Sequence, residues 1–113
     1  MKNSFDEKIL DEAKDWLVGN QNVVLATVIQ TWGSSPRPIG SRMIINDKGD
    51  FSGSVSGGCV ETAVVRECLG LFKEKKLFKK IEFKVSNESA WEVGLACGGE
   101  MAIFLEQIND GNN

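Results

Sequence analysis

The sequence predicts one small α/β or α+β domain, with two main helices covering a mixed sheet of about five to six strands. Three observations predict this. The 113 residues include 42% hydrophobic and 26% charged residues, the balance of a globular domain with its own core. The apolar run from Asn22 to Gln30 is typical of a central strand buried on both faces. Two stretches with apolar residues at helical spacing, one on each side of this strand in the sequence, predict the helices.

The first helix is expected to begin at Ser4, because Ser4-Phe5-Asp6-Glu7 fits a capping box. We expect Gly19-Asn20 to end it. Its apolar face would consist of Phe5, Ile9, Leu10, Ala13, Trp16 and Leu17. A tryptophan on such a stripe usually packs against a core or an interface, and Trp16 is interpreted in that way.

A hairpin is expected after the central strand. Arg42 to Ile45 forms its first strand, and Asn46-Asp47-Lys48-Gly49 forms its turn. The return strand, Asp50 to Val55, contains Ser52, Gly53 and Ser54. These small residues leave room for another group to approach the backbone closely.

The second helix is expected from about Cys59 to about Lys75, with Cys68 near its buried stripe. Phe78 to Val85 alternates imperfectly between apolar and charged residues, which favours a strand near a sheet edge. Ala90 to Gly94 is expected to form one helical turn, and Glu100 to Leu105 a last strand.

Charge and composition exclude several classes of function. The net charge of −3 argues against broad binding to nucleic acid or to anionic membranes, and no apolar run is long enough to cross a bilayer. With no histidine, a Ser-His-Asp triad and a His-ligated zinc site are excluded. Three cysteines without a secretion signal indicate reduced thiols and a cytoplasmic protein. No Cys-x-x-Cys spacing occurs, so we expect no zinc.

The candidate site centres on Val55-Ser56-Gly57-Gly58-Cys59-Val60-Glu61, where a strand gives way to a helix. Gly57 and Gly58 let backbone N–H groups approach a ligand, and the helix N-terminus favours an anion. A thiolate at Cys59, in the expected first helical turn, would be favoured for the same reason. The Ser56 hydroxyl adds a donor. The alternative is that Cys59 is simply a small residue in a tight turn.

Two further segments are expected to join this site. In Ala96-Cys97-Gly98-Gly99-Glu100, Gly98 and Gly99 expose the backbone beside a second thiol. In the loop from Trp32 to Arg42, Arg37 lies between two prolines that stiffen its presentation, and a guanidinium suits a phosphate. Arg42 has the alternative of pairing with a carboxylate. Together the three segments predict a site for an anionic, metal-containing ligand.

The same segments resemble the N-terminal domain of the XdhC/CoxI family, accessory proteins of molybdenum hydroxylases such as xanthine dehydrogenase. The resemblance rests on three stretches: Gly33-Ser34-Ser35-Pro36-Arg37-Pro38-Ile39-Gly40-Ser41-Arg42-Met43, Gly53-Ser54-Val55-Ser56-Gly57-Gly58-Cys59-Val60-Glu61 and Trp91-Glu92-Val93-Gly94-Leu95-Ala96-Cys97-Gly98-Gly99. It covers most of the chain from Val24 to Leu105.

The resemblance implies a chaperone that binds molybdenum cofactor, protects it and delivers it to an apo-enzyme, without being an enzyme itself. It also implies a cysteine desulfurase as a second partner. The family cysteine implicated in cofactor binding falls on Cys59, which makes Cys59 a candidate molybdenum ligand, and Cys97 falls on the second family motif. Arg37, Arg42 and the amides of Gly57 and Gly58 would hold the phosphate of the molybdopterin.

Two points leave alternatives open. Family members commonly continue into a Rossmann-like domain, whereas residues 1–113 are expected to form one domain without it, and a homodimer is one way to compensate. The cysteines also allow a redox protein that uses Cys59 and Cys97 as a thiol pair. A docking or oligomerisation module is the third hypothesis.

Overall fold

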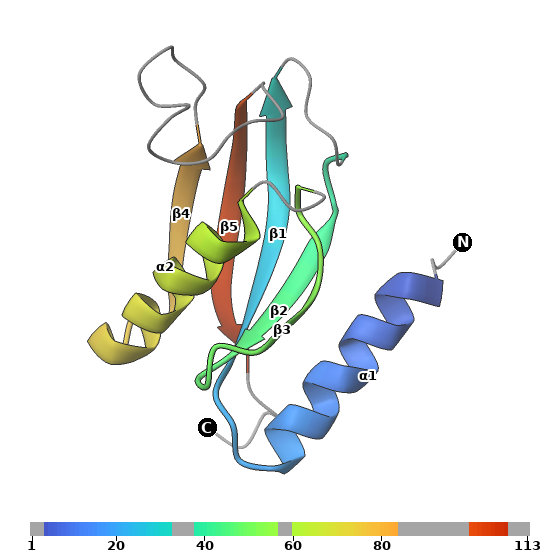
Figure 1. The fold of residues 1–113 in the computed structure, drawn as a ribbon, viewed down its shortest axis with the longest axis vertical. Helices are drawn as coiled ribbons and strands as arrows, with labels where there is room; N and C mark the ends of the chain where they lie inside the picture. The colour runs from blue at the N-terminus through green and yellow to red at the C-terminus, as the bar shows by residue number, and fades with distance from the viewer. Residues whose placement is uncertain (1–3, 33–37, 57–59, 84–99, 109–113) are drawn as a thin grey trace.

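The computed structural model describes residues 4–32, 38–56, 60–83 and 100–108, with backbone alone for residues 4–7 and 32. Its elements follow in the order α1 (Ser4–Val18), β1 (Val23–Trp32), β2 (Arg42–Asn46), β3 (Phe51–Gly53), α2 (Glu61–Glu74), β4 (Phe78–Phe83) and β5 (Glu100–Ile108). The predicted single domain with two main helices over one sheet is confirmed (Figure 1). The helical turn expected at Ala90 to Gly94 lies outside the described residues.

The five strands form one sheet in the order β3-β2-β1-β5-β4. All of the described pairings are antiparallel, whereas a mixed sheet was predicted from the sequence. The last strand explains the difference. β5 lies between β1 and β4 and runs antiparallel to both, so no crossover between parallel neighbours is needed.

The central strand β1 packs against a helix on each face of the sheet, as its continuous apolar sequence predicts. Val24, Ala26 and Val28 belong to the larger core cluster, which also contains residues of α2. Val23 belongs to a second cluster with residues of α1, and Leu25 packs against it. Since alternate residues of a strand point to opposite faces, the two helices cover opposite faces of the sheet.

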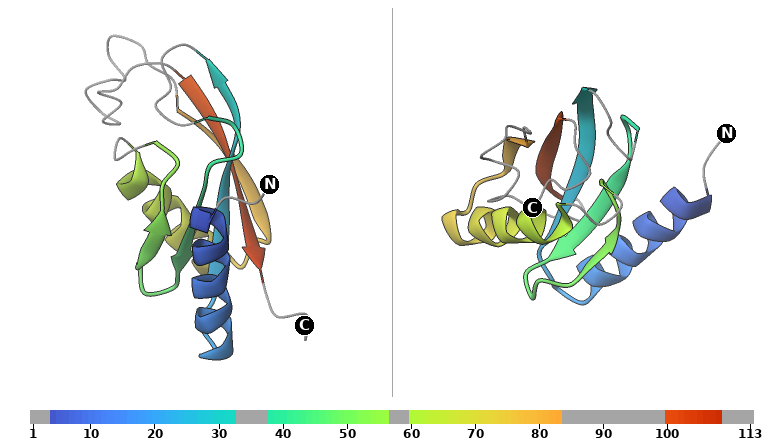
Figure 2. Two further views of the ribbon diagram at one scale, coloured as in Figure 1. Left: turned by 90° about the vertical axis from the view of Figure 1, so that its right-hand side faces the viewer. Right: turned by 45° about the horizontal axis from the view of Figure 1, so that its top comes forward.

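The helix α1 covers only part of its face. Ile9 and Ala13 are buried against Val23 and Ile44, and Trp16 packs on this cluster as predicted. Figures 1 and 2 show α1 beside the β2 and β3 edge, whereas α2 crosses the sheet obliquely over β5 and β4. The β5 and β4 half of the α1 face has no helix over it among the described residues.

The helix α2 begins two residues later than expected. Val60 is its N-cap and Glu61 its first helical residue, so Cys59 precedes the helix instead of lying in its first turn. The buried stripe includes Val64, Cys68 and Leu71, which confirms Cys68 as a core residue. No helix in the described part of the chain is long and apolar enough to span a membrane.

The hairpin turn between β2 and β3 forms as predicted and is joined to the start of β1. The side chain of Asn46 is 1% exposed; its Oδ1 accepts from the N–H groups of Lys48 and Asp50, both at 3.0 Å. Its Nδ2 donates to Gln21 at 2.7 Å. Asp47 accepts from the side chain of Asn22 at 3.0 Å. These bonds fix the hairpin against the connection between α1 and β1.

Candidate functional site

Of the predicted site residues, the structure describes Ser56 and Arg42. The rest of the set lies outside the described residues: Arg37, Gly57, Gly58, Cys59, Cys97, Gly98 and Gly99. Residues on both sides of the Gly57–Cys59 segment are described, however. These residues show how the chain enters and leaves the centre of the candidate site.

The carboxylate of Glu61 holds the segment that precedes the glycines. The Ser54 hydroxyl donates to Oε2 at 2.7 Å, and the N–H groups of Val55 and Ser56 donate to the same oxygen at 3.0 Å. The Ser56 hydroxyl donates to Oε1. The first residue of α2 therefore binds back across the turn to three consecutive residues after β3. We call this set of residues, Ser54, Val55, Ser56 and Glu61, the Glu61 clamp.

The hydrogen bonds of the Glu61 clamp determine the charge state of its carboxyl group. Burial by itself raises the pKa of Glu61, because it removes water from the carboxylate. Hydrogen bonds from Ser56, Ser54 and Val55 outweigh burial and lower the pKa from 4.5 to about 2. Glu61 is 6% exposed, so it is a buried carboxylate that stays ionised near neutral pH because its neighbours solvate it.

The Ser56 hydroxyl also closes the turn from its other side. The Val60 N–H donates to Ser56 Oγ at 2.8 Å, while the same hydroxyl donates to Glu61. Ser56 is 1% exposed, and the apolar side chain of the N-cap residue Val60 makes no capping hydrogen bond of its own. Ser56 and Val60, the residues that flank the Gly57–Cys59 segment, are thus joined directly by this hydrogen bond, in addition to the bonds that Glu61 accepts across the same turn. Val60 has a non-helical backbone, with φ −125° and ψ 6°, and its carbonyl accepts the first bond of the helix from the Val64 N–H at 2.9 Å, so α2 begins after Val60.

Gly53, the last residue of β3, lets this strand lie close to β2 just before the turn. Its φ is 92°, and a Cβ at this position would lie 2.6 Å from the carbonyl oxygen of Arg42 and 3.0 Å from the Cα of Met43. The next residue, Ser54, donates its N–H to the Arg42 carbonyl at 3.1 Å. The glycine therefore permits the close approach of β3 to β2 from which Ser54 reaches Glu61.

The backbone of Arg42 is connected to this turn, but its side chain lies on the face of the sheet that α1 covers, opposite the α2 face. Met43 packs in the α2 cluster and Ile44 in the α1 cluster, so strand alternation places Arg42 on the α1 face. Its Nε is the one buried side-chain nitrogen or oxygen without a hydrogen-bond partner in the described part of the chain. A buried guanidinium donor without an acceptor favours an anion.

The third thiol is chemically isolated from the candidate site. Cys68 is fully buried in the core beneath α2, and burial together with the charge of Glu67 raises its pKa to about 12. A thiol of this kind is almost wholly protonated and unreactive at neutral pH.

We expect Cys68 to remain unmodified when native protein is treated with iodoacetamide at neutral pH, and to be modified once denaturant is added. Peptide mass spectrometry checks both states. Rapid labelling of Cys68 in native protein would contradict the burial of its sulfur.

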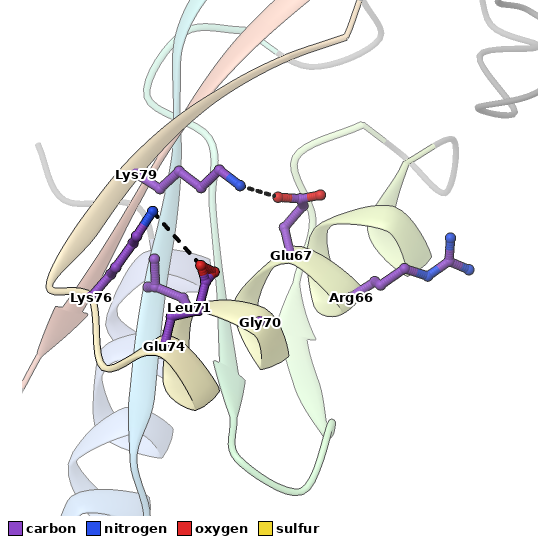
Figure 3. A pocket seen from close by; sticks show the side chains of 7 residues that line it. All are labelled: Arg66, Glu67, Gly70, Leu71, Glu74, Lys76 and Lys79. Carbon is purple, nitrogen blue, oxygen red and sulfur yellow. Dashed lines mark hydrogen bonds and ion pairs between the residues drawn. The ribbon is translucent and has the colours of Figure 1, made fainter.

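A separate pocket of about 220 Å³ lies between α2 and β4 (Figure 3). Charged side chains line most of it, and Lys79 binds Glu67 at 2.8 Å there. Glu74 and Lys76 form a looser ion pair at 3.7 Å. Neither Arg42 nor any residue of the Glu61 clamp is among the described residues that line this pocket, so the pocket is distinct from the Glu61 clamp.

Comparison with known proteins identifies the family. The model of the XdhC and CoxI family matches residues 16–80. The molybdenum cofactor insertion chaperone PaoD of Escherichia coli strain K12 is 32% identical over 101 residues, which cover 88% of this chain. The chain belongs to the XdhC and CoxI family.

Two further relatives agree with this assignment. A probable xanthine dehydrogenase subunit from Bacillus subtilis strain 168 is 30% identical over 81% of this chain. A crystal structure described as a xanthine dehydrogenase from Bacillus halodurans has a TM-score of 0.70 and 30% identity over 88% of this chain. This XdhC/CoxI chain spans 31% of PaoD, 28% of the Bacillus subtilis protein and 30% of the Bacillus halodurans chain.

The Glu61 clamp of this XdhC/CoxI domain was not predicted from the sequence. The structure shows Glu61 accepting four hydrogen bonds from residues before the turn, a role that was not predicted for it. The available signal was the pattern Ser54, Ser56 and Glu61 around two glycines. Serines just before a turn and a glutamate just after it supply matching donors and acceptors.

Proposed function

We propose that this chain binds molybdenum cofactor as cargo, protects it and passes it to a molybdenum hydroxylase apo-enzyme, acting as a carrier and not as a catalyst. The similarity to PaoD over 88% of the chain carries the proposal. A cysteine desulfurase that sulfurates the bound cofactor is the second partner in this proposal. The cofactor itself would supply the redox chemistry of the client enzyme.

The described residues fit an anionic cargo at one point. Nε of Arg42 is buried and has no acceptor among the described residues, and a phosphate oxygen would provide one. Arg42 is therefore proposed to hold the phosphate of the molybdopterin. Arg37 and the amides of Gly57, Gly58, Gly98 and Gly99 are proposed to bind other polar groups of the cofactor. The Arg42 side chain lies on the α1 face, whereas Val55 and Val60, on either side of the glycines, pack in the α2 cluster.

We assign Cys59 the role of thiolate ligand to molybdenum, with Cys97 as the second thiol of the site. Ser56 has a supporting role in this proposal, because its hydroxyl is already engaged by Glu61 and Val60 and is almost fully buried. The Glu61 clamp would hold the turn before Cys59 in place. The segment with Gly57 and Gly58 would then lose less conformational entropy when the cofactor binds.

The test is cofactor retention after co-expression with an active molybdenum-cofactor pathway. Wild-type protein is expected to carry molybdenum and a fluorescent pterin, and Cys59→Ala to lose most of both. Cys68→Ala is the matched control, because Cys68 is a core residue and its replacement should lower stability slightly while cofactor is retained. Arg42→Gln is expected to reduce the bound pterin at least severalfold, through loss of a charge-assisted contact.

Two outcomes would oppose the proposal. Equal molybdenum and pterin in wild type and Cys59→Ala would remove the thiolate from the site. Reversible cycling of Cys59 and Cys97 between two thiols and a disulfide, in protein that never binds cofactor, would favour the redox hypothesis. Thiol titration of the same samples distinguishes these results.

A further inference from the structure

The strand β4 is at an edge of the sheet. It pairs with β5 on one side, and no described strand pairs with its other side. An unpaired edge exposes a row of backbone N–H and C=O groups to which another strand can add. Natural proteins often protect such edges with charged residues, and β4 contains three: Lys79, Lys80 and Glu82. Whether these charges block or direct pairing depends on what each would face.

We propose that two copies of this chain pair through β4 in an antiparallel, twofold-symmetric arrangement centred on Ile81. In that register, Lys80 of one copy lies opposite Glu82 of the other, and Glu82 opposite Lys80. A twofold axis at Ile81, normal to the sheet, keeps the α2 faces of both copies on the same side. The result is a continuous ten-stranded sheet formed from two five-stranded sheets.

The charges of β4 discriminate between this register and its neighbours. Moving the twofold axis by one residue along β4 shifts the register by two residues, which is the smallest shift that keeps the same face of each strand aligned. Centring the axis on Lys80 would place two Lys80 side chains opposite each other, and centring it on Glu82 would do the same with two glutamates. Like charges directly opposite are unfavourable, whereas opposite charges stabilise a strand pair. The register centred on Ile81 is the one that pairs Lys80 with Glu82.

Both residues are available for this exchange. The side chains of Lys80 and Glu82 are 52% and 42% exposed, and they contact each other within the strand at 3.8 Å. This contact is an exposed pair of small energetic value. Exchanging it for two contacts across the strands keeps every charge compensated.

The remaining charge on β4 does not oppose pairing. Lys79 lies on the α2 face and donates to Glu67 of its own chain at 2.8 Å, as Figure 3 shows. The hydrogen bond to Glu67 raises the pKa of Lys79 and keeps its charge compensated within one copy. In the proposed register Lys79 lies opposite Phe83 of the second copy, which its aliphatic stem can contact.

The helix α2 leaves room for the added strand. Its last turn passes beyond β4 on one side of the sheet (Figures 1 and 2), so a strand added at this edge would lie beneath that turn, as β4 does.

Six residues of β4 form only a small interface, so we expect a dimer in exchange with the monomer. The proposal concerns a surface apart from the cofactor site and does not depend on it.

Analytical ultracentrifugation of the full chain over a concentration series tests this pairing. Wild-type protein is expected to dimerise. Lys80→Glu and Glu82→Lys are each expected to raise the dissociation constant at least tenfold, because each turns both symmetry-related attractions into repulsions. The double exchange K80E/E82K restores opposite charges and is expected to restore the dimer.

A matched control is Lys14→Glu, which reverses one charge at an exposed position of α1 and should leave the dimer unchanged. Circular dichroism of each variant separates loss of pairing from loss of folding. A monomeric wild type, a dimer insensitive to both single reversals, or a folded double variant that stays monomeric would each overturn the proposal.

Discussion

Glu61→Ala is expected to lower the free energy of unfolding by about 2–5 kcal/mol. The change removes the acceptor of the N–H groups of Val55 and Ser56, which are fully or almost fully buried. Each buried donor left without a partner costs about 1–3 kcal/mol. Urea unfolding followed by circular dichroism measures the difference. Glu74→Ala is the matched control, since Glu74 lies exposed in the last turn of the same helix and should change stability by less than about 1 kcal/mol.

The same carboxylate predicts how stability depends on pH. Because the folded pKa of Glu61 is about 2 and its ordinary value is 4.5, folding favours the ionised form. The resulting stabilisation, about 3 kcal/mol, is complete above about pH 5 and disappears as pH falls towards 2. Glu61→Gln should be less stable than wild type at pH 7 and should approach it at low pH. A constant difference between the two proteins from pH 7 to pH 3 would contradict the lowered pKa.

Gly53→Ala is expected to destabilise the domain by about 2–4 kcal/mol. Its φ of 92° is unfavourable for alanine, and the new Cβ would overlap the backbone at Arg42 and Met43. Backbone atoms cannot move aside as the end of a side chain can, so β3 would have to separate from β2. Thermal and urea unfolding measure the loss.

Gly70→Ala provides the opposite expectation for the same substitution. Gly70 lies inside α2, and a Cβ there would meet no atom within 4 Å. Alanine is the better helix former, so stability should rise by about 0.5–1 kcal/mol. Equal effects at Gly53 and Gly70 would show that the close approach of β3 to β2 has no energetic importance.

Local patterns were enough to predict most of the elements. The apolar run in β1 indicated a central strand, Asn46-Asp47-Lys48-Gly49 indicated the hairpin turn, and the spacing around Cys68 indicated a buried helix face. Each of these patterns involves residues close together in the sequence. Their structures follow from propensity and periodicity, which neighbouring residues determine.

Strand order, strand direction and the Glu61 clamp could not be predicted in this way. The position of β5 between β1 and β4 depends on pairing between residues that are far apart in the sequence. The start of α2 was placed too early because Val60, the N-cap residue, has a non-helical backbone and is joined to Ser56 in the turn that precedes the helix. The orphan Nε of Arg42 depends on the packing around it, which local sequence patterns do not determine.

The place of β5 in the sheet also constrains synthesis of the chain on the ribosome. β5 is the last described strand to be made, yet it joins β1 to β4 in the middle of the sheet. Until residues 100–108 have emerged, β4 has no strand partner within the sheet, and one side of β1 is unpaired. The nascent chain therefore exposes the two strand edges that β5 covers, one on β1 and one on β4, until residues 100–108 have left the ribosome, and a chaperone would reduce aggregation in that period.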